Sequence, residues 1–263
     1  MNKPSQLVST APRSRQAGFS LIELMIAVTI GLFITLGLSE MFLSMYTTSA
    51  TQRSFAQFQD NQRFAINILS NNLSLIGYYW DPNSTTITNA LVATTTSNPD
   101  GSAFAAGTGL VGTSPTTGSD TINVYYQSGG SAADGLINCQ GQTAPTAATP
   151  VTFINSFSID ANSNLVCAVR VGTGTTGSPL IVANNVQSMK ILYGLIFTPA
   201  SPTTLPPYVG SYMTATQINA ASVSSGVSQW GNISSIQITL VFLNPVTNTT
   251  ATRIQTFNVM YKL

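Results

Sequence analysis

The sequence contains no histidine and little charge: 6% of its 263 residues are charged, with 9 Lys and Arg against 8 Asp and Glu. Without histidine, a serine or cysteine nucleophile lacks its usual base, and zinc loses its usual nitrogen ligand. The acids beyond residue 80 are scattered along the chain, at Asp81, Asp100, Asp120, Asp134 and Asp160. The sequence therefore predicts neither an enzyme nor a protein that holds a metal or another cofactor.

Basic residues are too few for a nucleic-acid-binding surface. Lys3, Arg13 and Arg15 lie within the first 18 residues, so removal of that segment would leave an acidic balance. The remaining basic residues are far apart in the sequence: Arg53, Arg63, Arg170, Lys190, Arg253 and Lys262. Proteins that bind nucleic acid neutralise several phosphates with clustered Lys and Arg. We therefore expect no nucleic-acid partner.

Cysteine is also scarce, since Cys139 and Cys167 are the only two. Two cysteines without histidine cannot complete a four-ligand zinc site. In an oxidising compartment they predict one disulfide, worth roughly 3 to 4 kcal/mol by the loop-entropy estimate. Two unpaired buried thiols are the alternative. The abundance of Thr, Ser, Asn and Gly favours the first state, because it is typical of an exported, loop-rich β protein.

A long apolar run near the N-terminus is the main feature that the sequence does have. Phe19 to Ser39 would be about 30 Å long as a helix, which matches the hydrocarbon core of a bilayer. After Glu23 the run carries no charge until Glu40. Basic residues precede this segment, and the next one along the chain is Arg53. The positive-inside rule then predicts a cytoplasmic N-terminus and an exported remainder.

Two ordinary explanations of this segment fit poorly. A secretory signal peptide has a shorter apolar core that ends in a small-residue cleavage site, and this run is too long and lacks that ending. A plain membrane anchor would explain the length but not Glu23, since an unpaired carboxylate inside a membrane span costs several kcal/mol. Glu23 therefore needs a partner.

The string Gly18-Phe19-Ser20-Leu21-Ile22-Glu23 resembles the type III signal of type IV pilins and pseudopilins. In those families a membrane peptidase cuts after the glycine and N-methylates the new terminal phenylalanine. The resemblance implies cleavage between Gly18 and Phe19 and methylation of Phe19. It implies that Glu23 offsets the positive amine of Phe19, within one subunit or on a neighbour, as subunits pass from lipid into an apolar filament core.

The helix is predicted to continue beyond the apolar run as an amphipathic segment. Its apolar residues recur at helical spacing: Phe55, Phe58, Ala65, Leu69, Leu73 and Ile76. Gly77 and Pro82 provide a stop signal. We therefore expect three regions: a cleaved leader (1–18), a helix (19–76) with a membrane-anchoring part (19–39) and an amphipathic part (40–76), and a β-rich domain (77–263).

The domain contains seven strand-like runs: Thr121 to Gln127, Val151 to Ile159, Leu165 to Val171, Leu180 to Val182, Val186 to Leu195, Ile233 to Leu243 and Arg253 to Tyr261. In one of them Ile236, Ile238, Leu240 and Phe242 alternate with other residues, which predicts a face that packs on the helix. The expected fold is α+β, a long helix laid on an antiparallel sheet. The Gly-, Ser- and Thr-rich segments 83–119 and 198–232 are predicted to be long loops.

Several segments of the chain are similar to the PilW family of minor pilins. They are residues 59–65 and 75–78 of the helix, residues 186–194, and Trp230 just before residues 236–240. The chain departs from the family at Leu195-Ile196-Phe197, where an acid is common, and at its final residues Tyr261-Lys262-Leu263. Pilins also often have proline where this chain has Glu40, which leaves open whether the helix partly melts on assembly, with Gly31 and Gly37 as weak points.

This resemblance implies the pilin fold and a minor pilin that helps to initiate type IV pilus assembly or occupies the pilus tip. The implied partners are other minor and major pilins, the prepilin peptidase, the inner-membrane assembly platform and a tip adhesin. The protein would cross the bacterial inner membrane once, with its domain in the periplasm, and then enter the pilus. Two alternatives stay open: a large minor pseudopilin of a type II secretion system, and a DNA-uptake or receptor pilin, which would need a clustered basic face.

Overall fold

The computed structural model describes residues 18–94, 98, 100, 102–130, 134–145, 150–197 and 208–259. Residues 1–17 of the predicted leader and residues 260–263 at the end of the last predicted strand lie outside this part. The chain divides into two compact units, Met1–Arg53 and Ser54–Leu263, and helix α1 (Leu21–Leu73) contributes to both.

In the first unit every residue from 18 to 53 is exposed, and from Leu21 onward all of them are helical. Hydroxyl groups in the apolar part are satisfied by the helix itself. Thr29 Oγ1 donates to the carbonyl oxygen of Ile26 at 2.8 Å, and Ser39 Oγ donates to that of Thr35 at 2.7 Å. Such bonds let Ser and Thr enter a lipid environment without an unpaired polar group. The predicted long apolar helix is confirmed.

In the second unit, α1 packs one face into a hydrophobic core. Phe58, Ala65, Leu69 and Leu73 are buried, as the spacing predicts, whereas Phe55 remains 42% exposed. The helix ends at Leu73 rather than at the predicted residue 76, because the chain tightens into a turn that reaches Gly77. Gly77 has a φ of +73°, a left-handed conformation that glycine adopts without steric cost.

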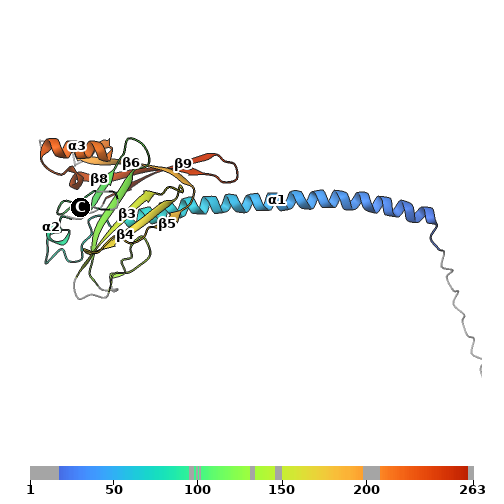
Figure 1. The fold of residues 1–263 in the computed structure, drawn as a ribbon, viewed down its shortest axis with the longest axis horizontal. Coiled ribbons are helices and arrows are strands. Elements are labelled where there is room, and N and C mark those ends of the chain that lie inside the picture. Colours follow the sequence, from blue (N-terminus) through green and yellow to red (C-terminus); the bar gives the residue numbers. More distant parts are fainter. Residues whose placement is uncertain are drawn as a thin grey trace, which may run out of the picture. The chain divides into compact units, whose positions relative to one another are not determined.

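In the part of the chain that the structure describes, nine strands form two antiparallel sheets. Figure 1 shows these sheets beside the end of α1. The first sheet has the order β1-β2-β3-β4-β5, with β1 Leu110–Thr113, β2 Thr121–Ser128, β3 Val151–Ile159, β4 Leu165–Val171 and β5 Leu180–Ala183. The second has the order β7-β6-β8-β9, with β6 Val186–Phe197, β7 Tyr208–Met213, β8 Ile233–Leu243 and β9 Thr250–Asn258. The described residues also include three short helices: α2 Ile87–Ala90, α3 Ala215–Ser225 and a 3₁₀ helix, Gln229–Asn232.

The α+β class with a long N-terminal helix and antiparallel strands is confirmed. The structure divides the strands between two sheets where the sequence predicted one. The chain passes from β5 to β6 through Asn184 and Asn185, and Asn185 has a φ of +57°. The side chain of Asn61 in α1 holds this crossing: its Nδ2 donates to the carbonyl oxygen of Asn184 at 2.8 Å, and its Oδ1 accepts from the amide of Asn184 at 3.3 Å.

The prediction of long loops at 83–119 and 198–232 was wrong in part. Strand β1 lies in the first segment and is too short, at four residues, to show a pattern. The second segment contains β7 and α3. Helix α3 has a capping box, in which Thr214 and Gln217 each bond the other's backbone, and it ends at Gly226 in the left-handed conformation. Both signals, Thr-x-x-Gln at the start and Gly at the end, can be read in the sequence.

One hydrophobic core joins the second half of α1 to both sheets. Ile236, Ile238, Leu240 and Phe242 of β8 are fully buried, which confirms the predicted inward face. The rings of Phe58 in α1 and Phe242 in β8 meet edge to face, with centroids 6.4 Å apart. The helix therefore packs directly on the second sheet.

The predicted disulfide is present between Cys139 and Cys167, with Cα atoms 6.4 Å apart. Cys167 lies in the middle of β4, while Cys139 lies in the turns between β2 and β3. The neighbouring Gln140 Nε2 donates to the carbonyl oxygens of Cys167 and Ser178, both at 3.0 Å. The bridge thus ties a long connection to the centre of the first sheet.

Replacing both cysteines by alanine is expected to lower the free energy of unfolding by roughly 3 to 4 kcal/mol, because the unfolded chain regains the entropy of an open loop. Denaturant unfolding of the full chain in detergent would measure this loss. Reduced wild-type protein is the control and should match the variant. Full alkylation of both thiols in unreduced native protein would contradict the bridge.

Candidate functional site

The residues predicted to carry the function gather where α1 begins. Leu21 is the first helical residue, so Ser20 is the N-cap and Glu23 is the third helical residue. The amide of Glu23 donates to Ser20 Oγ, and the amide of Ser20 donates to Glu23 Oε2, each at 3.4 Å. This reciprocal pair is a capping box, which satisfies two of the amides left without partners at a helix start. The negative charge of Glu23 in the first turn also interacts favourably with the helix dipole.

This geometry brings the Glu23 carboxylate close to the place where a cleaved chain would begin. The carboxylate already reaches the amide of Ser20, and the nitrogen of Phe19 is the preceding backbone nitrogen, one residue spacing of about 3.8 Å away. A positive amine on Phe19 would therefore lie within reach of the Glu23 carboxylate of its own subunit. The capping box and this ion pair use the same carboxylate and can compete for it.

The bond between Gly18 and Phe19 is accessible. Gly18 and Phe19 are exposed, with Phe19 at 86%, and an added Cβ at Gly18 would meet nothing within 4 Å. Space around Gly18 within this subunit thus does not require glycine. A requirement for glycine there would come from the enzyme that cuts the bond, and cleavage itself remains a prediction.

The apolar part of α1 is a large surface in need of cover. Within the described residues, α1 is the helix long and apolar enough to cross a membrane. Every large hydrophobic side chain from Leu21 to Tyr46 is at least half exposed. Exposure of such a surface to water is costly, at roughly 25 cal/mol per Å². Lipid or other apolar helices must therefore surround this segment.

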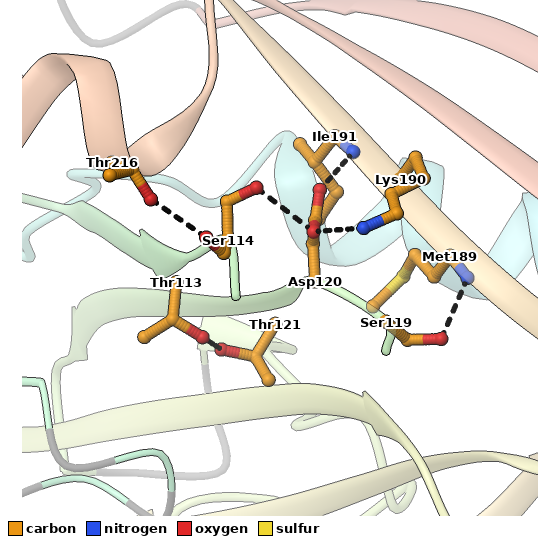
Figure 2. A network of polar contacts seen from close by, with 9 residues as sticks. All are labelled: Thr113, Ser114, Ser119, Asp120, Thr121, Met189, Lys190, Ile191 and Thr216. Carbon is orange, nitrogen blue, oxygen red and sulfur yellow. Dashed lines mark hydrogen bonds and ion pairs between the residues drawn. The ribbon is translucent and has the colours of Figure 1, made fainter. Parts of the chain in front are cut away.

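A second polar cluster lies in the domain, around Asp120 (Figure 2). Asp120 is 2% exposed and accepts hydrogen bonds from the amide of Ile191 at 2.8 Å, from Lys190 Nζ at 3.1 Å and from Ser114 Oγ at 3.0 Å. Ser119 Oγ accepts from the amide of Met189 at 3.2 Å. Since Asp120 directly precedes β2, while Lys190 and Ile191 belong to β6, the cluster ties one sheet to the other.

Asp100 forms a similar network beside this cluster. It accepts from the amide of Ser102 at 3.0 Å, from Thr121 Oγ1 at 2.5 Å and from Asn123 Nδ2 at 2.6 Å. The hydroxyl of Tyr193 is buried, and burial, with the charges of Asp120 and Asp100, raises the pKa of Tyr193 well above its ordinary value. Tyr193 is therefore neutral at physiological pH, so this region holds the sheets together without a reactive tyrosinate.

The structure thus separates the predicted site residues into two places. Gly18, Phe19 and Glu23 lie together at the start of α1, while Cys139 and Cys167 form a structural bond in the domain. Sequence reasoning missed the capping role of Ser20, although Ser-x-x-Glu before an apolar run is a readable helix-start signal. It counted Asp120 only among scattered acids. No local signal places Asp120 beside Lys190, 70 residues away.

Comparison with known families gives two matches. Residues 13–39 match the prokaryotic N-terminal methylation motif, which covers the Gly18–Glu23 segment and the apolar run. Residues 153–262 match the family described as type IV pilus-assembly protein W, a span that runs from β3 through β9. No curated protein and no solved structure matches the chain. Pilin-like families consist of structural proteins.

Proposed function

We propose that this chain, a type IV pilin-like protein that matches the PilW family, is a minor pilin that helps to initiate pilus assembly or occupies the pilus tip. Its precursor is cut after Gly18, and Phe19 is then N-methylated. Before assembly α1 crosses the inner membrane once, with the N-terminus in the cytoplasm and the domain in the periplasm. Its partners are other minor and major pilins, the prepilin peptidase, the inner-membrane assembly platform and a tip adhesin.

The observation that carries this proposal is the start of α1. An exposed apolar helix begins with a capping box whose acid, Glu23, is its only charged residue before Glu40. Lipid can cover the apolar surface but cannot neutralise the carboxylate. A bundle of such helices can do both, because the amine of Phe19 in one subunit can pair with Glu23 in the same subunit or in the next.

A place at the start or tip of the filament, rather than along its shaft, is supported by the size of the domain. Beyond α1 the described residues form nine strands in two sheets, together with long connections. A densely repeated subunit favours a small domain. The large minor pseudopilin of a type II secretion system is the second candidate, since the methylation motif supports both, while the PilW match favours the pilus.

Deletion of the chain is expected to reduce filament number severely, and the chain itself is expected to be far scarcer in filaments than the major pilin. An initiator acts once per filament, so its loss should reduce the number of filaments and not their length. Electron microscopy of deleted cells and quantitative mass spectrometry of sheared filaments would measure both quantities. Abundance near that of the major pilin would exclude the minor role, and normal piliation with lost secretion would favour the pseudopilin.

A further inference from the structure

A groove of about 400 Å³ lies in the second unit beside α1. Its lining comes from one face of the helix and from the edge strand β9, and every lining residue except Ile66 is polar: Gln59, Gln62, Arg63, Ile66, Asn67 and Arg253. None of these residues is acidic. Arg63 and Arg253 are two of only six basic residues that lie beyond the predicted cleavage point, and both are exposed.

The groove exists because α1 does not cover β9. In the register of the second sheet, Arg253 lies opposite Leu240 and Gln255 lies opposite Ile238. Directly opposed residues point to the same face of a sheet, so Arg253 and Gln255 occupy the face that packs on α1. Leu240 and Ile238 are fully buried there, whereas Arg253 and Gln255 are exposed. The polar residues Arg253 and Gln255 thus lie on the inward face of the sheet, at the strand that α1 does not cover.

Gln62 provides an unused hydrogen-bond donor at the base of this groove. Arg253 Nε donates to Gln62 Oε1 at 2.8 Å, which fixes the orientation of the amide, because the guanidinium can only donate. Gln62 is 3% exposed, and its Nε2 has no partner among the described residues. A buried donor without an acceptor is unfavourable, because it has lost its hydrogen bonds to water. An acceptor that enters the groove would recover this energy.

The groove therefore offers donors and positive charge without a counter-charge. Among the described residues Lys190 pairs with Asp120, and no ion pair joins a carboxylate to Arg63 or Arg253. Two guanidinium groups and an amide match a carboxylate, which accepts several hydrogen bonds at once. A nucleic-acid strand would need a longer row of basic residues, and the other cations of the chain lie elsewhere in the sequence.

We propose that this groove binds an acidic segment of a neighbouring pilin subunit, with its Asp or Glu carboxylate held by Arg63, Arg253 and Gln62 Nε2. The proposal rests on the proposed function, since it needs other pilins as neighbours. This contact lies on the domain, so it is separate from the contacts between the apolar helices. A charged contact there selects which subunit follows, since a wrong neighbour would leave the two arginines unpaired.

The test is site-specific photo-crosslinking in cells, with a photoreactive residue in place of Asn67, which lines the groove and is exposed. The expected product links residue 67 to a peptide of another pilin that contains Asp or Glu. Arg63→Glu combined with Arg253→Glu should reduce this product about tenfold or more, as expected for loss of charge-assisted bonds. Arg53→Glu, ten positions earlier on the same helix and outside the groove, is the matched control and should leave the product unchanged.

Replacing the crosslinked Asp or Glu of the neighbouring pilin by arginine should restore the crosslinked product in the variant that combines Arg63→Glu and Arg253→Glu. Disulfide closure and protease resistance check that the variants fold, and the neutral pair Arg63→Gln and Arg253→Gln provides a milder version of the same test. An unchanged product in the double variant, or a product with a segment that lacks acids, with lipid or with DNA, overturns the proposal. A chain absent from filaments refutes the proposed function, while a chain present in filaments without the crosslink refutes the groove alone.

Discussion

Replacing Gly18 by leucine is expected to leave the chain as an uncut precursor in the membrane and to remove it from filaments. The apolar helix must leave the bilayer to join other subunits in the filament. The basic residues of an uncut leader would keep the chain at the cytoplasmic surface of the membrane. Among the described residues, no group lies within 4 Å of a Cβ added at Gly18, so a larger side chain would disturb none of them. Loss of processing would therefore report on the peptidase and not on folding.

Mass spectrometry of the N-terminal peptide measures this outcome. Wild-type protein should begin with methylated Phe19, and the variant should retain residues 1–18. Gly31→Leu is the matched control, because Gly31 also has nothing within 4 Å of an added Cβ and lies inside the apolar helix. It should be processed normally. An intact leader on wild-type protein from filaments, or a cut beyond the apolar run, would refute the predicted maturation.

Replacing Glu23 by alanine is expected to lower filament number about as much as deletion of the chain, while processing and membrane insertion persist. The substitution makes the helix more apolar, so insertion is not impaired. Alanine also removes the capping box that Glu23 forms with Ser20. The loss of filaments could then have two causes, a weakened helix start or a missing ion pair.

Glu23→Gln separates these causes, because glutamine can close a capping box but cannot neutralise an amine. If the ion pair matters for assembly, the glutamine variant should resemble the alanine variant in filament counts by electron microscopy. Wild-type counts for Glu23→Gln would leave only the capping role. Glu40→Gln is the matched control at the far end of the apolar run and should have a small effect, because water reaches a residue at the membrane boundary.

The two polar contacts between distant parts of the domain serve different purposes. Asp120 is buried and fully bonded to Lys190 and Ile191, so it fixes the relation of the sheets within one molecule. Arg253 is exposed, and the buried Gln62 has a donor, Nε2, without a partner among the described residues, which suits a contact made only after a neighbour arrives.

The sequence alone determined the features that depend on near neighbours along the chain. The Gly18–Glu23 motif, the uncharged run and the 3.6-residue stripe through Leu69 predicted the helix and its two environments. Alternation in residues 233–243 predicted a strand with one buried face. These patterns can be read because the spacing of apolar residues along a helix or strand directly sets which side is buried. The cysteine pair could be predicted because no other cysteine competes for it.

Only the tertiary structure decided the features that join distant segments. The division of the strands into two sheets depends on the crossing at Asn184, which Asn61 holds from 123 residues away. The bond between Arg253 and Gln62 joins residues 191 positions apart, and both residues line the groove. An alternating pattern predicts a strand but not the sheet to which the strand belongs. A polar residue such as Arg253, on the face that packs on α1, is explained only when the structure shows that α1 does not cover β9. Which segments meet is set by how the whole core packs, and no local pattern records that.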